Sequence, residues 1–203
     1  MKLTRRAAAM AALVGFTFTA VPFTGASAAE PVTYREIVLG NAKAKVTVIE
    51  YASLTCPHCA HFTENDFPKL KAAYIDTGKI KFIYRDFPLD NLAAGAALIV
   101  RCAPTDRAMP LVEALFKNQD KWARVPNPLE EVTNFAQLAA GMSKADVEAC
   151  LNNTAVFDQI RDVAQKAVSL YKIGGTPTFF VDEEKIEGID FEALQSAIDK
   201  RHK

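Results

Sequence analysis

The sequence predicts an α/β protein in which a helical insertion separates the two halves of a sheet domain. Strand patterns with one helix between them occupy the chain up to residue 87, and strand patterns followed by a last helix return after residue 177. The segment between them, residues 91–171, carries almost no strand pattern and is typical of several consecutive helices. The order strand, strand, helix, strand, helical block, strand, strand, helix indicates this architecture.

Composition indicates one soluble globular domain. The 203 residues are 50% hydrophobic and 24% charged, with 24 basic and 24 acidic side chains. This is enough chain for a substantial hydrophobic core. There is no basic run and no excess of Lys and Arg, so we expect no nucleic-acid partner.

Residues 1–28 read as a signal peptide. They combine a basic start that includes Arg5 and Arg6, an apolar stretch over residues 7–20, and an A-x-A motif ending at Ala28. The alternative is an uncleaved membrane anchor, but the apolar stretch is short for a membrane span. We therefore expect cleavage near Ala28 and export to an oxidising compartment. The arginine pair leaves Sec and twin-arginine export both open.

Three strands are predicted before the insertion. The first covers residues 34–39. The second covers residues 45–51 (KVTVIEY), which are β-branched and mostly apolar, as in a strand buried on both faces. The third covers residues 79–87, where polar and apolar residues alternate. Glu50 stands where another apolar residue is expected, so its carboxylate is either buried or lies in water at an edge.

A helix is predicted over residues 56–76. Thr55 is a candidate cap, and Pro57 suits the first turn of a helix. Pro68 predicts a kink, and Gly78 marks the end.

The insertion and the C-terminal half follow the same reasoning. Pro104 and Pro110 punctuate the insertion, Ser143 with Asp146 resembles a capping box, and Asp190 is placed to cap the last helix. The predicted helices of the insertion cover residues 92–102, 111–122, 129–140, 144–151 and 155–171, and the returning strands cover residues 178–182 and 185–186.

The motif Cys56-Pro57-His58-Cys59 carries the chemistry. A thiolate attacks disulfides whereas a thiol does not, and a helix start stabilises the Cys56 thiolate through unpaired N–H groups and the positive dipole end. His58 adds a charge or a hydrogen bond when it is protonated. Each unit of thiolate stabilisation is worth about 1.4 kcal/mol, or roughly 30 mV. Half of a zinc site and an inert structural bridge are the alternatives, and redox chemistry is favoured over both.

The other two cysteines are Cys102 and Cys150. An even number of cysteines in an exported chain favours disulfides over metal ligands. Cys56 and Cys59 are too close in sequence for each of them to form a separate structural bridge. This leaves a bridge between Cys102 and Cys150 as the second disulfide, beside the pair Cys56 and Cys59. On the chain-entropy model it would stabilise the fold by roughly 4 kcal/mol. The alternative is a second redox centre that relays electrons.

A proline directly before the returning strand is the second informative feature. In Gly175-Thr176-Pro177, a cis bond before Pro177 would form a tight turn. Most X-Pro bonds are trans, so this interpretation depends on the motif at Cys56.

These features resemble the bacterial DsbA family, periplasmic dithiol oxidases with a thioredoxin fold. The resemblance runs from about residue 34 to the C-terminus. Besides the insertion, it rests on Glu50 six positions before Cys56, the Cys56–Cys59 motif, Phe62 and Gly175-Thr176-Pro177.

The resemblance implies a role for each residue. Cys56 would be the nucleophile and Cys59 the resolving cysteine. Pro177 would be a cis-proline beside them, with Thr176 offering backbone hydrogen bonds to an extended substrate. Glu50 would be a buried acid that assists proton transfer at Cys59.

Two departures from the family pattern stand out. Thr176 occupies a position where the best-known oxidases carry valine, and its hydroxyl could bond to a thiolate and shift the potential. The second is the extra pair Cys102 and Cys150, which many but not all relatives have.

The resemblance also implies a function and partners. Residues 29–203 would form a single periplasmic domain, without cofactor or metal, that introduces disulfides into exported proteins and is reoxidised by a DsbB-like membrane partner. Residues 29–33 leave no room for the N-terminal dimerisation domain of known isomerases, which favours a monomer. The alternatives are a disulfide isomerase or reductase, and a redox-inactive binding module or holdase.

Overall fold

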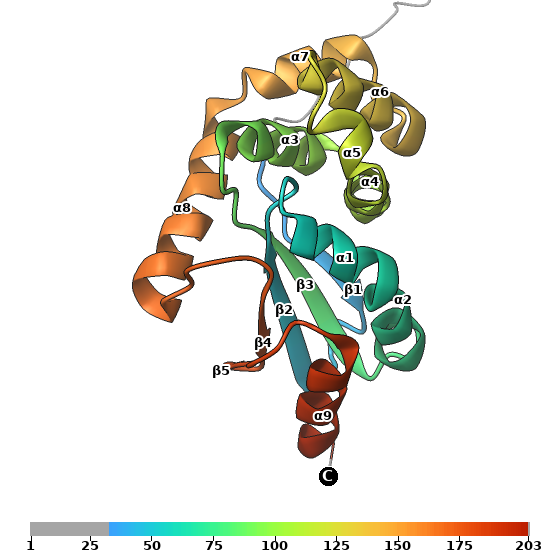
Figure 1. The fold of residues 1–203 in the computed structure, drawn as a ribbon, viewed down its shortest axis with the longest axis vertical. Helices are drawn as coiled ribbons and strands as arrows, with labels where there is room; N and C mark the ends of the chain where they lie inside the picture. Colours follow the sequence, from blue (N-terminus) through green and yellow to red (C-terminus); the bar gives the residue numbers. More distant parts are fainter. Residues whose placement is uncertain (1–32, 203) are drawn as a thin grey trace, which may run out of the picture. The chain divides into compact units, whose positions relative to one another are not determined.

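A five-stranded mixed sheet forms the centre of the computed structural model, which describes residues 33–202 (Figure 1). The predicted signal peptide at residues 1–28 lies outside the described residues. The strand order is β1-β3-β2-β4-β5. The strands are β1 (Ile37–Gly40), β2 (Val46–Ala52), β3 (Ile80–Asp86), β4 (Thr178–Val181) and β5 (Glu184–Lys185).

Strand direction changes on both sides of the central pair. β2 and β3 are parallel, while β1 pairs antiparallel with β3, β4 with β2, and β5 with β4. The register places Glu50 of β2 between Tyr84 of β3 and Phe179 of β4. Glu50 therefore lies on an interior strand with neighbours on both sides.

Helices follow the predicted order. The helical insertion gathers at one end of the strands, and its last helix returns alongside the sheet toward β4 (Figure 1). This confirms the predicted α/β architecture with an insertion between the two halves of the sheet. The helices are α1 (Pro57–Asn65), α2 (Phe67–Leu70), the π-helical turn η1 (Lys71–Ile75), α3 (Asn91–Cys102), α4 (Thr105–Lys117), α5 (Gln119–Trp122), α6 (Pro128–Ala140), α7 (Lys144–Leu151), α8 (Thr154–Tyr171) and α9 (Phe191–Arg201).

The predicted helix over residues 56–76 is divided as its proline suggested. α1 ends at Asn65, and α2 begins at Phe67 with Pro68 in its first turn. Proline has no N–H to continue the helical hydrogen bonds, so the chain restarts there. Asp190 and Ser143 cap α9 and α7, as their sequence patterns predict.

Two local predictions are wrong. Thr55 does not cap α1: Cys56 is the N-cap residue, and the Thr55 hydroxyl donates to Asp90 Oδ2 at 2.6 Å. The helix predicted from residue 111 already begins at Thr105 and contains Pro110. Pro110 is exposed, whereas its neighbours Met109 and Leu111 are buried. Their packing outweighs the single hydrogen bond that the proline removes.

Candidate active site

Cys56 lies at the junction between β2 and α1. Its φ and ψ are −79° and 122°, and Pro57 occupies the first helical position. Its N–H donates to the Ser53 carbonyl at 3.0 Å, which closes the turn that follows β2. Proline suits this position because the first N–H groups of a helix have no intrahelical partner. The strand end and the proline thus place the sulfur at the helix N-terminus.

The Cys56 thiolate is stabilised. A hydrogen bond from the Cys59 side chain lowers the pKa of Cys56 to about 5, although burial opposes the shift. The Thr176 side chain and the backbone N–H groups of Cys59 and His58 lower this pKa further. Local donors at the start of α1 therefore hold the charged form of Cys56 at neutral pH.

Cys59 has the opposite preference. Its side chain is fully buried, and burial raises its pKa well above the ordinary value. The hydrogen bond with Cys56 and the charge of Glu50 add to the increase. Cys56 and Cys59 are both free thiols in the structure. One sulfur of the pair is therefore a nucleophile, and the other holds its proton.

Glu50 is a buried acid on the central strand. Its residue is 1% exposed, and its Oε1 has no hydrogen-bond partner among the described residues. Burial, and then the nearby charge of Cys56, raise the pKa of Glu50 to about 8. Of the two sequence interpretations, the structure has the buried carboxyl rather than an edge residue in water.

The loop before β4 faces Cys56. The Thr176–Pro177 peptide bond is cis. Cys56 Sγ lies 3.2 Å from the Thr176 carbonyl oxygen, to which the thiol form donates. Pro177 is buried, and the Gly175 carbonyl accepts a hydrogen bond from the Thr178 hydroxyl at 2.7 Å. The loop thus brings residues from about 120 positions along the chain onto the Cys56 sulfur.

Pro57 and His58 are exposed beside Cys56. They are accessible to a second protein, whereas Cys59 is not. Within residues 33–202, no three His, Cys, Asp or Glu side chains are grouped so that they could hold a metal ion. None of the helices in that part of the chain is both long and apolar enough to span a membrane.

Two residues beside the site escape sequence reasoning. The Gln119 amide, at the start of α5, donates to the carbonyls of Leu54 at 2.7 Å and Cys56 at 3.1 Å. Asp90 caps α3 and accepts the bond from Thr55. Both residues tie the insertion to the active-site turn. No local motif marks either position, because only the tertiary fold brings them there.

Cys102 and Cys150 form a disulfide, with Cα atoms 6.1 Å apart. It joins the last residue of α3 to α7. The bridge therefore lies wholly within the insertion.

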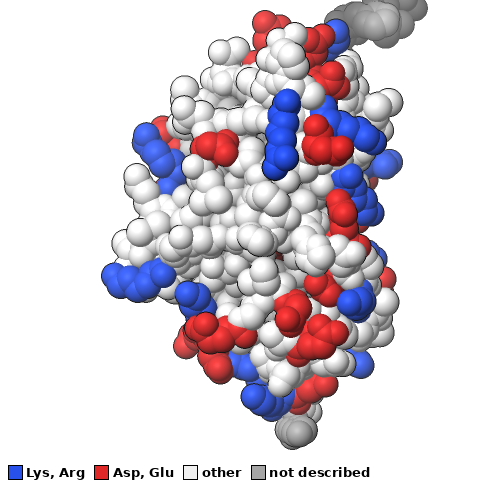
Figure 2. All heavy atoms as spheres, viewed as in Figure 1, with Lys and Arg blue, Asp and Glu red and all other residues white. Residues whose placement is uncertain are grey.

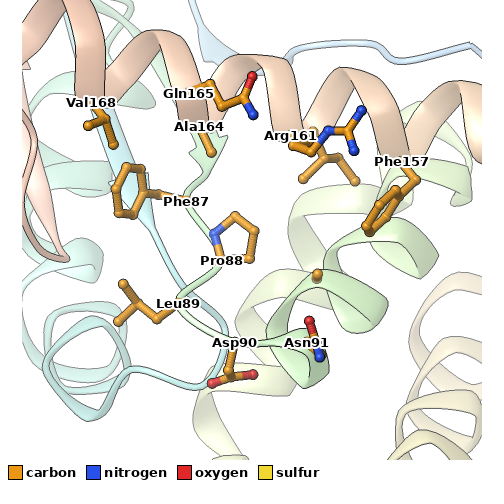
Figure 3. Close-up of a pocket in the computed structure, with 12 residues that line it drawn as sticks. Phe87, Pro88, Leu89, Asp90, Asn91, Phe157, Arg161, Ala164, Gln165 and Val168 are labelled. Carbon is orange, nitrogen blue, oxygen red and sulfur yellow. The ribbon is translucent and has the colours of Figure 1, made fainter.

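An open pocket of about 510 Å³ lies between residues 87–91 and α8 (Figure 3). Its apolar lining includes Leu89 and Phe157, which are 53% and 39% exposed. Asp90 belongs to the lining and bonds Thr55, the residue before Cys56. Figure 2 shows that, on the face it presents, the centre between the insertion and α9 carries few charged side chains. The Thr55–Asp90 bond thus connects the edge of the pocket to the turn that holds Cys56, although Cys56 does not line the pocket.

Comparison with known proteins places these observations in a family. The chain matches the family model described as Thioredoxin over residues 33–200. It is 37% identical over 169 residues to a Rickettsia conorii protein whose name describes a protein-disulfide oxidoreductase. That match covers 81% of this chain but only 60% of the relative, so the chain spans about three fifths of the length of that relative. Disulfide bond formation protein D of Bacillus subtilis is 28% identical, with 82% of this chain and 77% of that protein covered.

Solved structures agree with the predicted thioredoxin fold. The α-DsbA1 protein of Wolbachia pipientis superposes with a TM-score of 0.75 at 32% identity, covering 81% of this chain and 89% of that one. A protein-disulfide isomerase from Novosphingobium aromaticivorans superposes with a TM-score of 0.72 at 26% identity, covering 83% and 98%.

Proposed function

Because this chain belongs to the DsbA-type disulfide oxidoreductases of the thioredoxin family, we propose that it introduces disulfides into exported proteins through Cys56 and Cys59. The observation that carries the proposal is the asymmetry of the pair. The pKa of Cys56 is lowered to about 5, and that of the fully buried Cys59 is raised. A protein that stabilises its own thiolate favours its reduced form, and its disulfide is correspondingly oxidising.

The reaction has two exchange steps. A substrate thiolate attacks Cys56 Sγ in the Cys56–Cys59 disulfide, and the bond between the two cysteines breaks. Cys59 leaves with the electron pair and takes a proton from the Glu50 carboxyl. A second substrate thiolate then attacks the substrate sulfur of the mixed disulfide, and Cys56 leaves as a thiolate. The substrate has lost two electrons, and the protein has gained them.

Each surrounding residue has a place in this scheme. Cys56 is 5% exposed whereas Cys59 is fully buried, so Cys56 is the electrophile that the substrate attacks and the stable leaving thiolate. His58 and Pro57 lie on the surface that meets the substrate. Thr176, held between Gly175 and the cis bond to Pro177, presents its backbone to an extended segment of the substrate.

The pocket beside Asp90 would hold the substrate chain next to its reacting cysteine. It is lined by exposed apolar side chains and adjoins the Cys56 turn through the Thr55–Asp90 bond. Reduced polypeptides expose apolar residues that folded proteins bury, so an apolar pocket selects them. The occupant we propose is therefore an extended, reduced segment of polypeptide.

The setting of this activity follows from the same proposal. The N-terminal segment would direct the chain to the periplasm, where it acts as a monomer. A DsbB-like membrane protein would restore the Cys56–Cys59 disulfide after each round. Neither exchange step requires a metal or an organic cofactor.

The alternative is a disulfide isomerase or reductase, which works with Cys56 and Cys59 reduced. Two observations support this alternative: Thr176, which helps to lower the pKa of Cys56, stands where the best-known oxidases carry valine, and the Novosphingobium neighbour is named an isomerase. A redox-inactive binding module is the other alternative.

The deciding measurement is the equilibrium of the purified protein with glutathione, combined with thiol trapping in the native compartment. An oxidase has a potential above the poise of its compartment and is trapped mostly oxidised. A low potential and a mostly reduced pair would favour the isomerase or reductase. Full biological activity after replacement of both Cys56 and Cys59 by serine would favour the binding module.

A further inference from the structure

Four buried polar atoms of the sheet and of the segment before β1 have no hydrogen-bond partner among the described residues. They are the hydroxyls of Tyr34 and Tyr84, Glu50 Oε1 and Asp86 Oδ1. Such atoms are rare in folded proteins, and bridging water commonly explains them. Glu50 and Tyr84 interact electrostatically with Cys59, which indicates a connection to the thiol chemistry.

Register places three of these residues side by side. Glu50 and Tyr84 are paired residues of the parallel strands β2 and β3, so their side chains leave the sheet on the same side. Asp86 lies two residues after Tyr84 and shares that side. The residues of Glu50, Tyr84 and Asp86 are each no more than 1% exposed.

Arg101 of α3 closes the far end of this row. Its Nε donates to Asp86 Oδ2 at 2.5 Å, and its two terminal nitrogens donate to the carbonyls of Tyr84 at 3.2 Å and Arg35 at 2.6 Å. Its guanidinium carbon lies 4.4 Å from the centre of the Tyr34 ring. These bonds leave Asp86 Oδ1 free to accept another donor.

The row ends at Arg101, which is buried and lines a small pocket. The volume of this pocket is about 20 Å³, and Arg35 and Thr105, among others, also line it. That volume is close to what a single water molecule requires. Polar groups of neighbouring residues therefore connect Glu50 with a pocket that has room for about one water molecule.

We propose that Tyr84 is a positioning residue whose hydroxyl donates, through bridging water, to the Glu50 carboxylate, and that Asp86, held in place by Arg101, continues this path for the proton of Cys59 toward the small pocket beside Arg101. The proposal rests on the exchange chemistry of Cys56 and Cys59. The groups that face Tyr84 are Asp86 from its own strand, Glu50 from β2, Cys59 from α1 and Arg101 from α3.

The proton step can be isolated with an aromatic disulfide, dithiobis(nitrobenzoate), as the oxidant. The Cys56 thiolate attacks it, forms a mixed disulfide and releases one coloured thiolate. Cys59 then gives its proton to the Glu50 carboxylate and attacks Cys56 Sγ. The Cys56–Cys59 disulfide forms, and a second coloured thiolate leaves. The first phase of colour reports on Cys56 and the second on the loss of the Cys59 proton.

Tyr84→Phe is the test. Its hydroxyl has no protein partner, so we expect the variant to fold. The first phase should be unchanged. The second should slow by about tenfold at neutral pH and shift its pH midpoint upward, as expected when a carboxylate loses one hydrogen bond. If Tyr84 only stabilised the fold, its replacement would not shift the pH midpoint of the second phase while leaving the first phase unchanged.

Tyr51→Phe is the matched control. Tyr51 is a buried tyrosine that follows Glu50 in β2 and faces the other side of the sheet, where its hydroxyl meets Arg85. It should leave both phases at their wild-type rates. Should Tyr84→Phe fail to fold, Tyr84→Leu, which also lacks the hydroxyl, is measured in its place with the same expected result. An unchanged second phase in whichever variant is measured overturns the proposal. A low potential against glutathione would instead remove the oxidase function and leave this test intact.

Discussion

The two cysteine pairs of this chain use the same residue type in opposite ways. Cys102 and Cys150 form a disulfide within the insertion, between α3 and α7. Cys56 and Cys59 are free thiols at the start of α1, with pKa values shifted in opposite directions. The difference lies in the surroundings. A helix N-terminus, a buried carboxyl and a facing loop make the pair Cys56 and Cys59 reactive.

The largest effect is expected when the reactive sulfur of Cys56 is removed. Cys56→Ser should abolish thiol–disulfide exchange, because no other sulfur at the site is accessible: Cys59 is fully buried. Exchange with a reduced polypeptide, followed by mass spectrometry of quenched samples, measures this directly. Cys59→Ser cannot form the Cys56–Cys59 disulfide, so it should instead accumulate a mixed disulfide when it is given an oxidised polypeptide: the Cys56 thiolate attacks the polypeptide disulfide, and the other polypeptide sulfur leaves as a thiolate. The control is Cys102→Ala with Cys150→Ala, which should exchange at the wild-type rate. Exchange that survives Cys56→Ser would contradict the assignment.

Stability should show the reverse pattern. The Cys102–Cys150 bridge spans 48 positions, so its removal should lower the free energy of unfolding by about 4 kcal/mol on the chain-entropy model. Replacing Cys56 and Cys59 by serine in the reduced protein removes no cross-link and should cost much less. Urea unfolding of both variants, measured under the same conditions, compares the two costs. If the two variants lost the same free energy of unfolding, the Cys102–Cys150 disulfide would stabilise the fold no more than the thiols of Cys56 and Cys59 do.

How much of the difference between the two cysteine pairs can be predicted from the sequence depends on where the responsible residues lie in the chain. The reactive pair and its helix start are contiguous, so the part of the thiolate stabilisation that comes from Cys59 and His58 can be predicted from residues 56–59, whereas the part that comes from Thr176 cannot. Tyr84 and Gln119 are ordinary core and surface residues by every local pattern. They acquire a role only because β3 pairs with β2 and α5 packs against the active-site turn. Tertiary contacts of this kind leave no periodicity in the sequence.

The fold was predictable for a related reason. Hydrophobic period and helix capping are local, so the strands and the capped helices α7 and α9 agree with their patterns. The errors arose where a tertiary partner competed with a local one. Thr55 bonds Asp90 instead of capping α1, and core packing around Pro110 outweighs its preference for a helix start.

The buried acid beneath the reactive pair should give the protein an unusual dependence on pH. The pKa of Glu50 is about 8 in the fold against 4.5 as the ordinary value. Between these values the folded protein keeps a proton that the unfolded chain has lost. The contribution of Glu50 to stability should therefore be greatest below about pH 4.5 and fall as pH rises to about 8, by on the order of a few kcal/mol.

Glu50→Gln tests this dependence, because the amide fills the same space and does not titrate. Unfolding of the oxidised protein over this pH range should lose most of its slope in the variant. In the reduced wild type, Cys56 acts with the opposite sign: its folded pKa of about 5 lies below the ordinary 9.0, so it adds stability as pH rises. The reduced curve should therefore be flatter than the oxidised one. Parallel curves for the two redox forms would show that Cys56 does not titrate as assigned.

The smallest expected effect concerns the binding of a polypeptide beside the cysteines. Only the pair Cys56 and Cys59 lies near the apolar pocket that Leu89 lines, because Asp90 of the pocket bonds Thr55, the residue before Cys56. Leu89→Ser should weaken binding of a reduced polypeptide by about 1 kcal/mol, roughly fivefold in KM, since part of one leucine is no longer buried. Exchange with glutathione, which is too small to fill the pocket, should keep its rate. Leu138→Ser on α6, where leucine is 85% exposed, is the matched control and should change neither value. An equal rise in KM for both variants would mean that general surface apolarity, and not this pocket, holds the substrate beside Cys56.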